Sequence, residues 1–169
     1  AARQEVDATL TDGDFAGAVG LLLKEIREEG ATADIPFLAE ALKIVVSAMT
    51  GRGSLHEAAG LAQVLADLFP FHPPAVFWGL SLQGDIHRML NQAPQAIEMY
   101  RAASRVVDAG PDAVSEALIA IADVLRVEGY LAESGAALRE IINLSQGPGQ
   151  RYQVRSEEHT SELQSPNTI

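Results

Sequence analysis

Cysteine is absent from the 169-residue chain, and aromatic residues make up only 5% of it. Without thiols the chain cannot form disulfides, thiolate nucleophiles or cysteine-ligated zinc sites, although its cellular compartment stays open. Hydrophobic residues still reach 47%, so the core must be built mainly from Ala, Leu, Ile and Val. No apolar run approaches the ~18 residues that suggest a membrane helix, which predicts that the chain does not span a membrane.

Basic charge is also scarce, with 12 Lys and Arg against 23 Asp and Glu and a net charge of −11. Such a chain repels phosphate backbones and anionic lipids, which argues against nucleic acid as a partner. We predict a protein or peptide partner, with self-association open; alternatively, the acidity only keeps the chain soluble. Two Lys against ten Arg, together with abundant Ala, indicate a GC-rich bacterial genome.

The first residues, AARQEVDATL, lack the basic and then apolar layout of a signal peptide, so we predict a cytoplasmic location. They also lack an initiator Met, and we therefore expect the natural N-terminus to lie upstream.

Motifs that carry chemistry are missing as well. The chain has no phosphate-binding loop and no GxSxG motif, and Asp85 and His87 stand two apart, which points them away from each other on a helix. We predict no catalytic residues, no metal and no cofactor, hence a chain that is not itself an enzyme. The alternative is a regulatory or helical domain of a larger enzyme or transcription regulator.

What the chain does contain is an internal repeat. Four segments share a turn followed by an amphipathic helix with a small residue near its start. These small residues are Ala18, Ala58, Ala96 and Ser134, spaced 40, 38 and 38 apart. Before each lies another stretch whose apolar residues recur every three or four positions, the helical period. The predicted helix–turn–helix units are about 3–30, 34–70, 73–108 and 111–145.

Prolines support these boundaries, because they fall where helices should begin, a position that tolerates proline. They are Pro36, Pro73, Pro74, Pro94 and Pro111. Each pair carries more apolar surface than it can bury alone, so we predict an all-α, helix–turn–helix repeat solenoid over residues 1–146, followed by coil over 147–154.

Large apolar residues are expected to fill this stack. Between layers we place Leu22, Leu65, Tyr100 and Leu138. The predicted joint between the second and third pairs consists of Phe69, Phe71 and Phe77.

The pattern resembles the tetratricopeptide repeat (TPR). In the third unit, Gly84, Ala96, Tyr100 and Ala103 stand at the family's small and aromatic positions. The other matches are Ala18 and Leu22; Val46, Ala58, Ala62, Leu65 and Pro70; and Ala122, Ser134 and Leu138. Gln83 and His87 depart from the pattern, and the period near 38 exceeds the family's ~34 by about one helical turn.

The resemblance covers residues 3–145 and implies a scaffold that binds a peptide or a partner helix on its concave face. The residues it places there are Glu40, Lys43, Ser47, Trp78, Ser81, Asp85, Arg88, Met89, Glu116, Ile119, Asp123 and Arg126. Asp85/Arg88 and Asp123/Arg126 are interpreted as two ion pairs within helices or as a charged ladder along the groove. Trp78 is either a core residue or the anchor for a partner.

Two narrower resemblances bear on function. Lys43 fits a carboxylate clamp, but the accompanying Asn residues are missing, which argues against that subtype. The size, acidity and segments AVFWGLSLQG and AIEMYRAA are similar to the small acidic TPR chaperones of bacterial type III secretion, which is a second functional hypothesis.

The end of the chain differs from the rest. Residues 155–165, RSEEHTSELQS, match the translation of a common short-read sequencing adapter, and the segment has no apolar face. We therefore predict that residues 155–169 are disordered and non-native, and that the natural C-terminus is unknown.

Overall fold

A computed structural model describes residues 2–145; the predictions for the coil and for the adapter-like segment lie outside these residues. Within them the chain forms α-helices, one short 3₁₀ turn and no strand. The elements are α1 (Ala2–Thr11), α2 (Phe15–Glu29), η1 (Gly30–Thr32), α3 (Ile35–Gly51), α4 (Leu55–Leu68), α5 (Pro73–Met89), α6 (Ala93–Ser104), α7 (Ala113–Val127) and α8 (Leu131–Ser145). In this part of the chain, no helix combines the length and apolar character that a membrane crossing needs.

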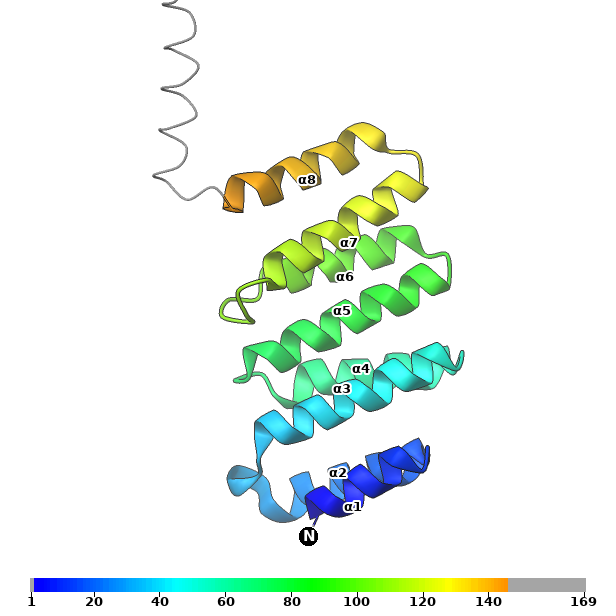
Figure 1. The fold of residues 1–169 in the computed structure, drawn as a ribbon, viewed down its shortest axis with the longest axis vertical. Coiled ribbons are helices and arrows are strands. Elements are labelled where there is room, and N and C mark those ends of the chain that lie inside the picture. Colours follow the sequence, from blue (N-terminus) through cyan, green and yellow to red (C-terminus); the bar gives the residue numbers. More distant parts are fainter. Residues whose placement is uncertain (1, 146–169) are drawn as a thin grey trace, which may run out of the picture.

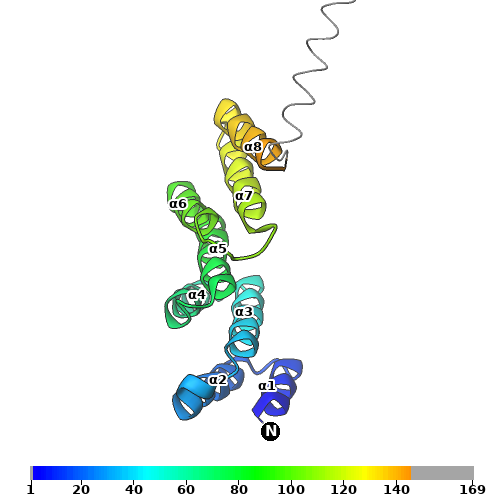
Figure 2. The same ribbon diagram turned by 90° about the vertical axis from the view of Figure 1, so that its left-hand side faces the viewer.

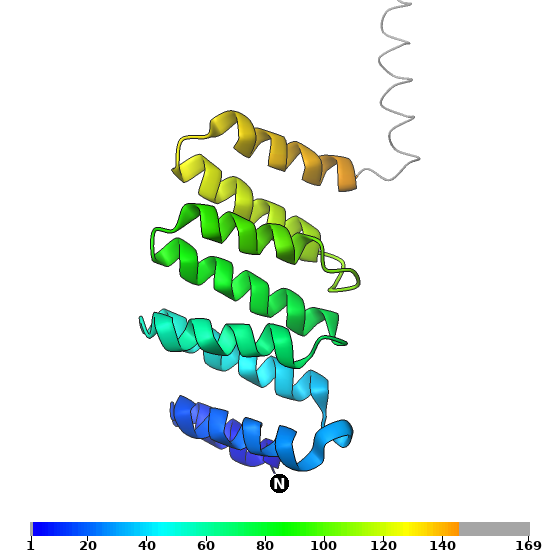
Figure 3. The ribbon, with the colours of Figure 1, turned by 180° about the vertical axis from the view of Figure 1, so that it is seen from behind.

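The helices form a solenoid-like stack in which consecutive helices pack against each other (Figure 1). The predicted all-α repeat fold is confirmed. In Figure 2, the odd-numbered helices α1, α3 and α5 lie on one side of α2, α4 and α6, and Figure 3 shows the even-numbered side from behind. Over α1–α6 the stack therefore presents two different faces, one from each set of helices, whereas α8 does not continue the layer of α2, α4 and α6 in Figure 2.

Turn residues explain why the chain reverses at the same point in every pair. Gly13, Gly53 and Gly129 adopt positive φ angles of 75°, 82° and 86°, and Asn91 takes this role in the third pair with a φ of 57°. Each stands five residues before its small residue. Glycine and asparagine are the residues that enter this left-handed region most readily, so the turn chemistry repeats with the period of the sequence.

Helix starts follow from caps and prolines. The Asp14 carboxylate accepts a hydrogen bond from the Gly17 amide at 2.9 Å, and Asp34 caps α3 in the same way at Phe37, at 3.2 Å. Such caps satisfy amides that the first turn leaves without a partner. Prolines stand in the first turns of α3, α5 and α6, as predicted, whereas Pro111 lies just before Asp112, the N-cap of α7.

The small residues that mark the repeat lie inside the stack. Ala18, Ala58, Ala96 and Ser134 are all buried. The Ser134 hydroxyl donates to the Ala122 carbonyl oxygen at 2.7 Å, so its polar group is satisfied inside the stack. The register predicted from these four positions is confirmed.

Two predicted core residues are exposed instead. Leu22, Leu65 and Tyr100 are buried, but Leu138 is 46% exposed because no described helix packs on that side of α8. Phe69 is buried at the joint between the second and third pairs, as predicted. Phe77 is buried too, but it packs against Ala103, Ala113 and Ala117, at the joint between the third and fourth pairs. Phe71 is 98% exposed, because it lies in the turn that carries the chain from α4 to α5.

Candidate binding surface on the odd-numbered helices

The twelve residues predicted to bind a partner all lie on three odd-numbered helices, and none of them is buried. Helix α3 carries Glu40, Lys43 and Ser47; α5 carries Trp78, Ser81, Asp85, Arg88 and Met89; α7 carries Glu116, Ile119, Asp123 and Arg126. We call the surface formed by α1, α3, α5 and α7 the odd-helix face.

Trp78 is half-buried and serves two purposes at the α3–α5 junction. One side of it packs against the hydrophobic cores above and below. Lys43 of α3 places its Nζ 4.4 Å from the centroid of the Trp78 ring, a cation–π contact, and His72 meets the ring edge-on at 6.3 Å. The contact between Lys43 and Trp78 closes the junction between these helices on the odd-helix face.

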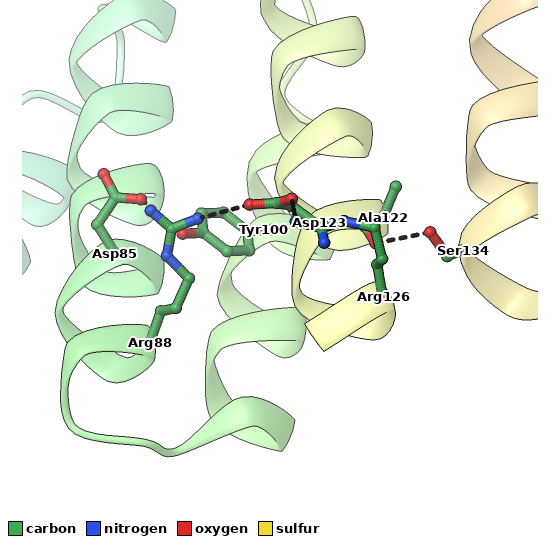
Figure 4. Close-up of polar contacts among 7 residues, drawn as sticks. All are labelled: Asp85, Arg88, Tyr100, Ala122, Asp123, Arg126 and Ser134. Carbon is green, nitrogen blue, oxygen red and sulfur yellow. Dashed lines mark hydrogen bonds and ion pairs between the residues drawn. The ribbon is translucent and has the colours of Figure 1, made fainter. Parts of the chain in front are cut away.

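Tyr100 of α6 positions a carboxylate on this face from behind. The tyrosine is 2% exposed, and its hydroxyl donates to Asp85 Oδ1 at 2.5 Å (Figure 4). Burial, with the hydrogen bond to Asp85 as a further cause, raises the pKa of Tyr100 well above its usual value. Asp85 is therefore held by a phenol that stays protonated.

Arg88 and Asp123 close the α5–α7 junction. Arg88 Nη1 lies 3.4 Å from Asp123 Oδ2, and Arg126 Nη2 donates to the other oxygen of Asp123 at 2.7 Å (Figure 4). The hydrogen bond from Arg126, together with its charge, lowers the pKa of Asp123.

The predicted ion pair within α5 is therefore wrong, while the one within α7 is confirmed. Among the described residues Arg88 pairs with Asp123 rather than with Asp85. The physical reason is that Asp85 already accepts the Tyr100 hydroxyl, whereas Asp123 offers a second oxygen across the junction. The charged groups form a bridge between pairs instead of two separate pairs.

The remaining predicted residues stand along the same surface without taking part in these contacts. Glu40, Ser47, Met89, Glu116 and Ile119 are exposed. Ser81 is partly buried, and its hydroxyl oxygen has no hydrogen-bond partner within the described part of the chain. The surface therefore combines accessible apolar, acidic and hydroxyl groups between the two closed junctions.

The sequence predictions missed a cleft at the first junction. Between α1 and α3 lies a cavity of about 440 Å³. Its lining residues are Arg3, Asp7, Leu10, Asp34, Pro36, Phe37, Glu40, Ala41 and Ile44. Only Glu40 of these was predicted, yet Phe37, Ala41 and Ile44 stand four and then three residues apart, a helical stripe that could have identified this wall.

A second cavity, of about 540 Å³, lies between α6, α7 and α8. Its rim carries Arg101 and Arg105 from α6 or its C-terminal end, and Glu133 and Glu140 from α8. Opposite charges balance there, so this cavity favours neither sign of ligand.

In comparisons with known proteins, the sequence matches no family model and no curated protein. Within residues 2–145, no group of three or more His, Asp or Glu side chains gathers as it would around a metal ion. What the surface does has to follow from its own side chains.

Proposed function

We propose that this chain is a protein-interaction module, similar to tetratricopeptide repeats, that holds a peptide or a partner's helix along the odd-helix face. The supporting observation is the alignment of accessible side chains on successive helices. With a period of 38, Glu40, Trp78 and Glu116 form one row, and Ser47, Asp85 and Asp123 form another. Rows that cross the helices in this way suit an elongated ligand, which meets one helix after another.

The charged side chains on this face are better suited to binding a ligand than to stabilising the fold. The side chains of Arg88, Asp123 and Arg126 are 44–61% exposed, and exposed ion pairs add little to folding free energy. Their hydrogen-bonding groups can instead meet a ligand's backbone and side chains. Trp78 supplies a large ring at the centre, and aromatic and arginine residues dominate the binding energy of protein interfaces.

A selection from a phage-displayed random peptide library tests the proposal on the full chain. Enriched peptides are synthesised with a fluorescent label, and their affinity is measured by fluorescence polarisation. The double variant Trp78→Ala/Arg88→Ala should weaken binding at least about tenfold, the loss expected from one hot-spot residue.

The matched control is Gln95→Ala/Arg101→Ala, which changes two exposed residues of α6 in the other layer and should leave affinity unchanged. Circular dichroism confirms that both variants are folded. Equal affinity of the parent chain and a folded Trp78→Ala/Arg88→Ala variant for every selected peptide would contradict the proposal.

A further inference from the structure

The three junctions between successive odd-numbered helices differ in one respect. Lys43 over Trp78 closes the α3–α5 junction, and Arg88 with Asp123 closes the α5–α7 junction. The α1–α3 junction instead holds the cavity of about 440 Å³. On the odd-helix face, this cavity gives a ligand's side chain room to enter between two helices, whereas the cavity lined by Arg88 and Val124 measures only about 80 Å³.

Equivalent positions in the repeat explain why this cleft is open. Leu10 stands where α5 has Arg88, so no guanidinium reaches across from α1. Ser47 stands where α7 has Asp123, so the acceptor is missing as well. The bridge that closes the α5–α7 junction therefore has neither of its ends at the α1–α3 junction.

The walls of the cleft are apolar in the middle. Leu10, Phe37 and Ala41 line it, and Ile44 of α3 is 49% exposed beside them. Covering this accessible isoleucine with a ligand's apolar group contributes favourable binding free energy, because it removes apolar surface from water. The cleft therefore fits a large aliphatic or aromatic side chain.

The rim of the cleft is acidic once its internal ion pair is taken into account. Arg3 Nη2 lies 2.8 Å from Asp34 Oδ2, and the Arg3 guanidinium stacks 4.3 Å from the Phe37 ring centroid. Arg3 and Asp34 thus neutralise each other. Asp7 on α1 and Glu40 on α3 remain, exposed and without an ion-pair partner among residues 2–145.

Asp7 also lacks the hydrogen-bond donor that its equivalent in the third pair has. It stands in the row of Asp85, whose carboxylate accepts the Tyr100 hydroxyl. The position of Tyr100 is occupied in the first pair by Leu22, which has no hydroxyl to donate. A carboxylate on each wall of an apolar cleft is complementary to an apolar side chain with a cation on either side of it.

We infer that the α1–α3 cleft is a subsite for a cationic peptide segment, in which a large apolar side chain enters between Leu10 and Ile44 and flanking Lys or Arg residues pair with Asp7 and Glu40. The inference rests on the proposed function and specifies its ligand. The chain's net charge of −11 also draws such a segment toward it and disfavours a second copy of the same acidic chain. The balanced cavity between α6 and α8 offers no comparable preference.

Three labelled peptides that differ only at their centre test the inference on the full chain. Their central residues are Arg-Leu-Arg, Glu-Leu-Glu and Arg-Ser-Arg within the same Gly/Ser sequence. Fluorescence polarisation at low salt should rank the Arg-Leu-Arg peptide tightest. The variant Asp7→Asn/Glu40→Gln should weaken that peptide roughly threefold to tenfold, as expected for two exposed ion pairs, and Ile44→Ser should remove its advantage over Arg-Ser-Arg.

The matched control is Glu133→Gln/Glu140→Gln, which removes the same charge at the other cavity and should leave the affinity unchanged. Equal weakening by this control would show that only net charge matters, and it would overturn the inference. Binding of the Glu-Leu-Glu peptide at equal strength would overturn it too.

Two further outcomes separate the inference from its basis and from self-association. If library peptides bind and depend on Trp78 while the Arg-Leu-Arg peptide does not bind, the cleft inference fails and the proposed function stands. If no peptide of either kind binds, both fail. Sedimentation equilibrium supplies the last check, because a dimer that Asp7→Asn/Glu40→Gln dissociates would make a second copy the occupant and overturn the peptide inference.

Discussion

The α1–α3 junction and the α5–α7 junction use the same repeat positions, but one is open and the other is closed. At the closed junction Tyr100 reaches from α6 to Asp85, and Arg88 crosses to Asp123. At the open junction, Leu22 and Leu10 stand at the positions of Tyr100 and Arg88. Both leucines take part in the hydrophobic packing, Leu22 as a buried residue and Leu10 against it.

This difference shows that the repeat register sets where helices pass each other, while single side chains decide whether the space between them stays accessible. Gly84 contributes to the closed junction, since a Cβ at this position would lie 2.5 Å from the Tyr100 ring. The tyrosine therefore packs directly against the backbone of α5. Stability should concentrate at the closed junction and ligand access at the open one.

The largest effect is expected from removing the tyrosine ring. Tyr100→Ala should lower the free energy of unfolding by about 3–5 kcal/mol, the range for deleting a buried aromatic side chain. Phe37→Ala at the open junction should cost clearly less, because Phe37 is only partly buried. Urea unfolding followed by circular dichroism measures both, and equal costs would show that the two junctions are packed alike.

A methyl group at Gly84 should have the next largest effect. Gly84→Ala would press against the Tyr100 ring, and overpacking of this kind costs about 1–3 kcal/mol. Gly20→Ala in α2 is the control, since nothing lies within 4 Å of the added Cβ and alanine favours a helix interior over glycine by roughly 1 kcal/mol. Thermal unfolding should thus shift in opposite directions for the two variants; a stabilising Gly84→Ala would contradict the close approach.

The Tyr100 hydroxyl should contribute less than the ring. Tyr100→Phe removes the hydrogen bond to Asp85, which lowers the free energy of unfolding by about 1 kcal/mol near neutral pH. Circular dichroism during urea unfolding at neutral pH measures this difference.

The same hydroxyl should govern stability in alkali. Because the pKa of Tyr100 is raised in the folded chain, the unfolded chain releases the phenolic proton first, near pH ~10. This contribution to stability is complete below that pH and is lost as pH rises further. Urea titrations at increasing pH should show a steeper alkaline loss for the parent than for Tyr100→Phe, and parallel curves would exclude the buried phenol as the cause.

The smallest effect is expected at the ion bridge. A double-mutant cycle with Arg88→Ala and Asp123→Ala should give a weak favourable coupling that disappears at ~1 M salt, because both side chains are exposed. The lowered pKa of Asp123 adds stability at neutral pH that is lost as pH falls through the acid range. A coupling unaffected by salt would show that the bridge is shielded from solvent.

Much of the fold could be predicted from the sequence because its signals are local. The spacing of Ala18, Ala58, Ala96 and Ser134 fixes the repeat register, and the glycines at the turns repeat with it. Phe71 and Leu138 were misplaced because hydrophobicity alone does not say whether a neighbouring helix is there to cover a residue.

The sequence predicted which residues lie on the odd-helix face, but not which of them form ion pairs and hydrogen bonds with each other. The residues of α3, α5 and α7 follow from the register, but the choice of Arg88 between Asp85 and Asp123 depends on Tyr100, which comes from another helix. The α1–α3 cleft was missed because its openness results from the absence of bridging side chains, and Asp7 looks like any solvated acid in the sequence.

Helix α1, one wall of the open junction, is expected to undock transiently from the stack. It has ten residues, fewer than the ~12–15 below which an isolated helix is marginal in water, and Val6 anchors it in the hydrophobic core with Leu22 and Leu38. We expect α1 to undock more often than the central helices, so its amide hydrogens should exchange faster. Since α1 forms one wall of the cleft, a ligand seated there should slow this exchange, and its apparent affinity should depend on how often α1 is docked.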